Sequence, residues 1–286
     1  MNRYFTISRK IYVFATLLCV ASFTACSKDE LQENQSSSNT LRLQFDSKFG
    51  DQDFELKKRY PYRTASGTAE SDLELSFDRL RYWVSNVKLV KADGSEVAIP
   101  ESYYLIEETG AITVPHLKQD EQYPATKRDE VTIPHVEAGS YNAIKFSIGV
   151  EPKYNDNITL RAGELGLLNG MGFSDGWMWF TSYIFQKLDA TMYSGTESKS
   201  LRWDSGSNAL YEGAEKSITF PSAITIDQKQ GLNVHVKVDV RELLTTSNDP
   251  WQNNMITQST PELMLAFRNA LLEKAMQLES ATAITE

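Results

Sequence analysis

Apolar and polar residues alternate with a period of two along much of the chain from Leu41 onward. Segment 41–46 alternates Leu and Phe with Arg, Gln and Asp, and segment 73–78 repeats this pattern. The longest example, 232–240, interleaves one Leu and four Val residues with Asn, His, Lys and Asp. Strict alternation places one side of a strand on a core and the other side in solvent.

Further runs rich in β-branched and aromatic residues occupy 80–91, 103–107, 141–150, 179–188 and 217–226. Turn-forming pairs such as Asp93-Gly94 separate them. Many short strands without interleaved helices predict a mainly β fold, either an antiparallel β-sandwich or an antiparallel barrel. The polar, turn-rich stretches 108–130 and 191–215 predict long loops.

One C-terminal segment has helical periodicity instead. Thr260 is a candidate N-cap, and Pro261 suits the first helical position. Leu263, Phe267 and Leu271 then fall on one helical face. We therefore expect an amphipathic helix near 261–278 that packs against the sheet, rather than one offered to a partner.

The N-terminus has the three parts of a secretory signal. Arg3, Arg9 and Lys10 precede an apolar run from Ile11 to Phe23, and a small residue stands directly before Cys26. The run is shorter than the roughly 20 residues that span a bilayer. A Cys at the cleavage boundary resembles the bacterial lipobox, so we expect a signal peptide over 1–25 and a lipid attached to Cys26.

Three regions follow from this cleavage site: the signal peptide, a tether over 26–39 and a folded domain over 40–286. The tether is polar and cannot pack a core. Its Lys28-Asp29-Glu30 step resembles the surface-export signal of Bacteroidota lipoproteins, and the alternative is an outer-membrane lipoprotein that faces the periplasm.

Cysteine count and charge narrow the chemistry of the mature chain. Cys19 is lost with the signal, so the domain contains no disulfide. Cleavage also removes three positive charges, which changes the net charge from −9 to −12 (−9 − 3). Such a charge disfavours nucleic acid and anionic lipid, so the membrane contact is expected to be the acyl anchor.

Three blocks in order resemble the MbnP-like family of exported copper-binding proteins. They are 75–89, which contains Arg-Tyr-Trp-Val-Ser-Asn-Val; 138–150, which begins Ala-Gly-Ser-Tyr; and 170–188, which contains Gly-Trp-Met-Trp-Phe. The resemblance implies a β-sandwich outside the cytoplasm and copper as the bound metal. It also implies a Trp that a dihaem peroxidase-like partner oxidises to kynurenine.

Candidate copper ligands are few, because the chain has three His residues. His116 and His135 both follow Pro and are expected at loop ends, where they could converge on a metal; the alternative is two unrelated surface His residues. His235 is expected on the solvent face of its strand, with no ligand role. Copper-binding relatives carry a His near a Gly after the third block, whereas 201–206 contains none, and Asp204 there is typical of a turn former.

Three Trp residues are candidates for the oxidised or site aromatic. Trp177 and Trp179 have the spacing to share one strand face, and Trp203 lies in a region predicted to be a loop. Core packing is the alternative role for the first two.

No phosphate loop, nucleophile elbow or zinc-protease motif is present, so we expect no enzymatic activity. The leading hypothesis is a lipid-anchored extracytoplasmic protein that captures or presents copper. The alternative is a cell-surface module that binds a glycan or a partner protein.

Overall fold

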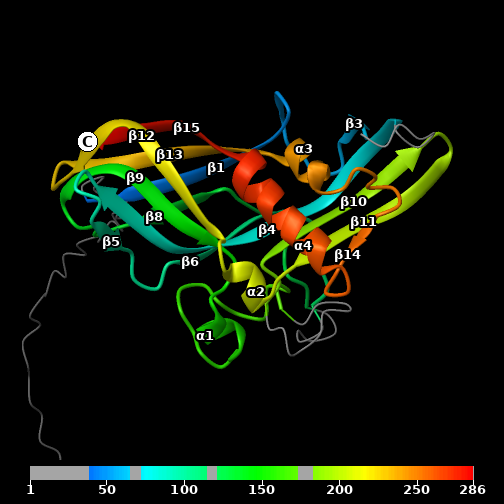
Figure 1. Ribbon diagram of the computed structural model, residues 1–286, viewed down its shortest axis with the longest axis horizontal. Helices are drawn as coiled ribbons and strands as arrows, with labels where there is room; N and C mark the ends of the chain where they lie inside the picture. The colour runs from blue at the N-terminus through cyan, green and yellow to red at the C-terminus, as the bar shows by residue number, and fades with distance from the viewer. Residues whose placement is uncertain (1–38, 65–71, 115–120, 173–182, 286) are drawn as a thin grey trace, which may run out of the picture. The chain divides into compact units, whose positions relative to one another are not determined.

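The computed structural model describes residues 39–64, 72–114, 121–172 and 183–285 (Figure 1). The predicted signal peptide, Cys26 and the tether up to residue 38 lie outside these residues. Two β-sheets and a few short helices form the described part. None of the helices in these ranges has the length and apolarity that a bilayer span requires.

The smaller sheet has the strand order β15-β13-β1-β2, and β8 also pairs with β1. Its strands are β1 (Leu41–Phe49), β2 (Gln52–Asp53), β8 (Glu130–Ile133), β13 (Gln230–Asp239) and β15 (Met276–Thr285). The N-terminal and C-terminal parts of the described chain therefore meet in one sheet, with β13 between β1 and β15 (Figure 1).

The larger sheet is organised around the long strand β4. On one side, β4 pairs with β10 and then with β9; on its other side it pairs in turn with β3, β6 and β5. The strands of this sheet are β3 (Arg59–Arg63), β4 (Asp72–Lys91), β5 (Glu96–Ala98), β6 (Tyr103–Thr109), β7 (Thr126–Arg128), β9 (Gly139–Ile148), β10 (Gln186–Ser194), β11 (Glu197–Ser205), β12 (Glu215–Ile226) and β14 (Met255–Ile256).

The apolar faces of the two sheets pack against each other, which confirms the predicted β-sandwich. Phe45 on the smaller sheet meets Tyr82 and Phe146 of the larger sheet edge to face, with ring centroids 6.1 Å and 5.7 Å apart. The alternating Leu and Val residues of β1 and β13 are buried in this core, as the period of two predicted.

Strictly antiparallel pairing was the wrong prediction for two strand pairs. β1 pairs with β13 in parallel, and β14 pairs with β11 in parallel. The period of two reports which face is buried and carries no information on strand direction. β13 is also far from β1 in sequence, so no hairpin turn fixes the relative orientation of these two strands.

The predicted C-terminal helix forms but ends earlier than position 278. α4 (Pro261–Asn269) continues into a π-helical turn, η3 (Ala270–Ala275), and β15 begins at Met276. Phe267 packs on Trp203 of the larger sheet, with ring centroids 5.6 Å apart. The apolar residues Met276 and Leu278 suit a strand with alternating burial as well as a helical face, which explains the misplaced end.

The long loop predicted over 191–215 was also wrong. β10 continues to Ser194, β11 follows after a short turn, and α2 (Asn208–Tyr211) comes next. The remaining short helices are α1 (Pro152–Asn155), α3 (Val240–Leu243) and η2 (Leu244–Thr246). Several polar residues of β10 and β11 are buried against other polar groups, so composition alone did not reveal these strands.

Candidate metal centre

Three side chains that can bind a metal converge on the outer face of the smaller sheet. Asp46 is on β1, His235 on β13 and Glu279 on β15, and these strands are neighbours. Because the inward residues of β1 and β13 are apolar, Asp46 and His235 project from the opposite face. Glu279 lies at a β-bulge, where the register shifts between His235 and Val236. A bulge redirects a side chain, and here it brings the carboxylate beside the imidazole.

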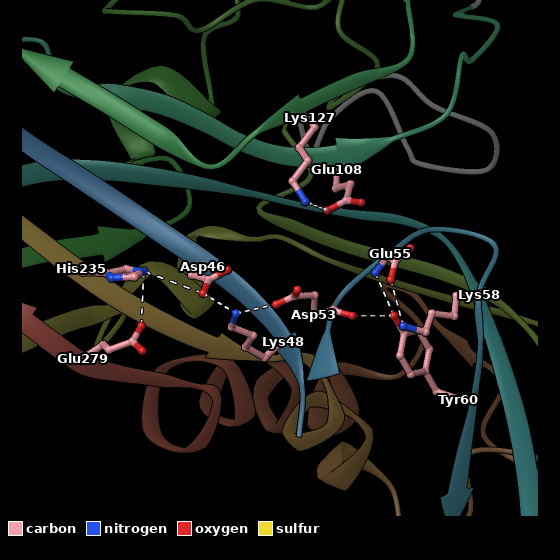
Figure 2. Close-up of polar contacts among 10 residues, drawn as sticks. All are labelled: Asp46, Lys48, Asp53, Glu55, Lys58, Tyr60, Glu108, Lys127, His235 and Glu279. Carbon is pink, nitrogen blue, oxygen red and sulfur yellow. Dashed lines mark hydrogen bonds and ion pairs between the residues drawn. The ribbon is translucent and has the colours of Figure 1, made fainter. Parts of the chain in front are cut away.

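The imidazole of His235 lies between the two carboxylates (Figure 2). Its Nε2 is 3.3 Å from Oε2 of Glu279 and 3.9 Å from Oδ2 of Asp46. That nitrogen is buried and has no hydrogen-bond partner among the described residues. One ligand atom from each of the three residues lies within 4.8 Å of the other two. Two donor atoms bonded at about 2.0–2.2 Å to one transition metal lie about 3.0–3.5 Å apart, so the His235–Glu279 distance already fits a shared ion, whereas the Asp46 oxygen is somewhat too far away.

Lys48 is the cation that the group holds in this structure. Its Nζ is 2.8 Å from Oδ2 of Asp46, the oxygen that also faces His235, and 2.6 Å from Oδ1 of Asp53 on β2. The hydrogen bonds to Asp46 and Asp53 raise the pKa of Lys48, and the hydrogen bond from Lys48 lowers the pKa of Asp53. Lys48 therefore remains charged and competes with a metal ion for Asp46.

Tyr60 fixes the turn that carries Asp53. Its hydroxyl accepts a hydrogen bond from the backbone N–H of Glu55 at 2.8 Å and donates to the carbonyl of Asp53 at 2.9 Å (Figure 2). The Asp53 carboxylate itself is largely exposed. A second carboxylate is thus held within reach of Lys48 without taking part in the group around His235.

The donor set determines which metals suit this group. One imidazole nitrogen and two carboxylate oxygens match divalent ions such as Cu(II) or Zn(II), whereas Cu(I) prefers sulfur. Among the residues that the structure describes, Asp46, His235 and Glu279 are the one group of three such side chains within this distance.

The predicted metal pair of His116 and His135 is not brought together by the described structure. His116 lies outside the described residues. His135 is exposed, has a backbone φ of +58°, and lines a cavity of about 200 Å³ beside Pro134 and Glu137. Within the described ranges, it belongs to no group of three potential ligands.

Of the three candidate aromatics, the structure describes Trp203 alone; Trp177 and Trp179 lie outside the described residues. Trp203 is fully buried on β11, and its Nε1–H donates to the carbonyl of Asn253 at 2.8 Å. The prediction of a loop position was wrong, because this Trp packs in the core. Asp204 is not a turn former either: it lies on the same strand, buried against Lys187.

The sequence did not predict this group, because Asp46, His235 and Glu279 lie far apart along the chain. The period of two placed His235 on an outward face, and the same alternation put Asp46 on the outward face of its own strand. Neither pattern shows that the two strands are neighbours, and the bulge that positions Glu279 has no signal in the sequence. His235 is also less exposed than expected, because the two flanking strands shield it.

Comparisons with known proteins place the chain in a family. A family profile described as MbnP matches residues 38–264. Among solved structures, MbnP from Methylosinus trichosporium is similar, with 14% identity and a TM-score of 0.39 over 68% of this chain and 75% of that one. No curated protein matches.

Proposed function

Because the chain belongs to the MbnP family, we propose that it is an extracytoplasmic protein that captures a divalent transition metal, with Cu(II) as the favoured ion. The observation that carries this proposal is the buried Nε2 of His235, which lacks a hydrogen-bond partner among the described residues and faces two carboxylates. The family resemblance favours copper, and the donor set favours its divalent state. The protein acts by binding, without catalysis.

Capture proceeds by exchange of one cation for another. The metal binds the neutral imidazole and the carboxylates of Asp46 and Glu279, and it takes the Asp46 oxygen from Lys48. Asp53 then retains Lys48, which already lies 2.6 Å from its carboxylate. Protons compete for the imidazole, so affinity decreases as the solution becomes acidic.

We also propose where the protein is located. The lipobox-like sequence before Cys26 and the polar tether after it support a lipid anchor that holds the domain near the outer membrane. Either a surface-facing or a periplasm-facing orientation gives the group around His235 access to metal outside the cytoplasm.

Equilibrium dialysis tests the metal site. The protein is extracted from membranes in detergent, stripped with a chelator and dialysed against micromolar Cu(II). We expect one equivalent of copper, lost in His235→Asn and retained in the matched variant His135→Asn. Intact mass of the same sample reports the lipid on Cys26 and any oxidised Trp.

Two results would refute the proposal. One is a wild-type protein that binds no copper and has an unmodified mass for every Trp. The other is the reverse pattern, in which His135→Asn abolishes binding and His235→Asn retains it, since the copper would then be held by the residues near His135.

A further inference from the structure

A row of charged side chains crosses the larger sheet, on strands that do not contribute to the metal site. The strand registers place Glu107, Arg81, Lys187 and Asp204 side by side on β6, β4, β10 and β11. Nη2 of Arg81 lies 2.6 Å from Glu107, and Nζ of Lys187 lies 2.6 Å from Asp204. All four side chains are almost inaccessible to solvent, at 0–3% exposed.

Burial of these ion pairs is costly for the fold. Removing two charges from water has a desolvation penalty that is often larger than the attraction between them. A protein with well-packed apolar residues of similar size at these positions is often at least as stable. A reason other than stability is therefore needed for this row.

A cavity of about 440 Å³ lies over the next row of the same strands. Arg79, Asp189 and Arg202 are paired there across β4, β10 and β11, and all three line the cavity together with Lys187. Three cationic groups and one carboxylate therefore face the same space. An adjoining hollow of about 500 Å³ shares Arg79, Asp189 and Arg202.

Two groups at this cavity have unused hydrogen-bonding capacity within the described structure. Arg79 makes one ion pair there, from Nη1 to Oδ2 of Asp189 at 3.3 Å, so most of its guanidinium N–H groups remain for a ligand. Oδ1 of Asp189 is buried and has no hydrogen-bond partner; the nearest cation, Lys187, is 3.6 Å away. The N–H groups of Arg79 can therefore donate hydrogen bonds to an anionic group of a ligand, and Oδ1 of Asp189 can accept one from a hydroxyl or amine of the same ligand.

Gly170 lines the cavity and packs closely against its neighbours in the wall. A Cβ at this position would lie 3.2 Å from Ile112 and 3.3 Å from Val114. It would also lie 3.8 Å from Nη1 of Arg81, a fully buried nitrogen without a hydrogen-bond partner among the described residues. The buried row that contains Arg81 therefore lies next to this wall.

We propose that the cavity binds a small organic anion that also carries a hydrogen-bond donor. Arg79 and Lys187 hold the anionic group, and Oδ1 of Asp189 accepts the donor. The volume lies within the range of about 300–1,000 Å³ that is typical of small-molecule sites, and it is larger than an inorganic anion requires. This site is independent of the metal centre.

Titration by NMR with malate and succinate tests the proposal, because the two probes differ by one hydroxyl. The full chain carries His235→Asn and is stripped with a chelator, so that neither dicarboxylate binds through a metal ion. We expect saturable binding of malate in the millimolar range, about fivefold tighter than succinate, since one hydrogen bond contributes about 1 kcal/mol. Inorganic phosphate is the third probe and should bind more weakly than malate.

Variants of the lining residues separate this site from general charge effects. Arg79→Gln should weaken malate binding at least tenfold. Arg63 is an exposed residue on β3, and Arg63→Gln should leave malate binding unchanged. Asp189→Ala should increase the affinity for succinate and abolish the preference for malate over succinate. Absence of saturable binding by both dicarboxylates would overturn the proposal, and so would equal effects of Arg79→Gln and Arg63→Gln in variants that keep the wild-type melting temperature.

Discussion

At the scale of single residues, the sequence predicted side-chain direction better than side-chain partners. The alternation of polar and apolar residues predicted that His235 points outward from its strand, and the structure confirms this direction. The carboxylates beside it come from strands at opposite ends of the chain, so no local pattern could connect them. Asp204 shows the reverse failure, because a polar residue near Gly was interpreted as a turn although ion pairs with the buried Lys187 and the half-buried Arg202 hold it inside the sheet.

Lys48→Met should increase the affinity for Cu(II). The lysine occupies an oxygen of Asp46 that the metal needs, and partly exposed ion pairs of this type contribute up to about 1 kcal/mol. Removing the competitor should therefore tighten binding by up to about fivefold in isothermal titration calorimetry. Lys58→Met, which removes an exposed pair with Glu55, is the control and should have no effect. Weaker binding by Lys48→Met would show that Lys48 supports the site instead.

Asp189 should make stability depend on pH. Burial is the main cause that raises the pKa of this carboxyl, so the folded state binds its proton more tightly than the unfolded state does. The stabilising contribution is complete below the unfolded pKa of about 4 and is lost as pH rises through the folded pKa. Urea unfolding should show that the wild type loses stability relative to Asp189→Asn as pH rises above 4. A constant difference between the two proteins would contradict this assignment.

At the scale of elements, strands with one apolar face were predictable and strands with buried charges were not. β1 and β13 follow the period of two closely. β11 carries Arg202 and Asp204 on a covered face, so its composition resembles a loop. The end of α4 was missed for a related reason: the apolar residues after Ala275 satisfy both a helical and an extended pattern.

The junction after β9 depends on a residue without a side chain. Gly149 has φ of +111°, and a Cβ there would lie 2.4 Å from Cδ2 of Phe185. Gly149→Ala adds backbone strain to overpacking, so it should destabilise the domain by about 3 kcal/mol in urea unfolding. Gly94→Ala has a similar φ of +83° with no atom within 4 Å, so it should cost about 1 kcal/mol. Equal losses for the two variants would mean that contact with Phe185 is unimportant.

At the scale of the whole molecule, the order of three sequence blocks was sufficient to identify the family and the sandwich. It was not sufficient to locate a metal site. The candidate His116, Trp177 and Trp179 lie outside the described residues, and the group that the structure does assemble arises from the parallel pairing of β1 with β13. Direction and adjacency of strands are properties of the complete fold, which explains why the site could not be predicted from local patterns.

Electron paramagnetic resonance of the Cu(II)-loaded protein tests whether Asp46, His235 and Glu279 bind the metal. Binding through Asp46, His235 and Glu279 predicts coupling of the copper to one imidazole nitrogen, with oxygen as the remaining ligands. That coupling should disappear in His235→Asn and persist in His135→Asn. Coupling to two or more nitrogens, or a spectrum that His235→Asn leaves unchanged, would contradict the account.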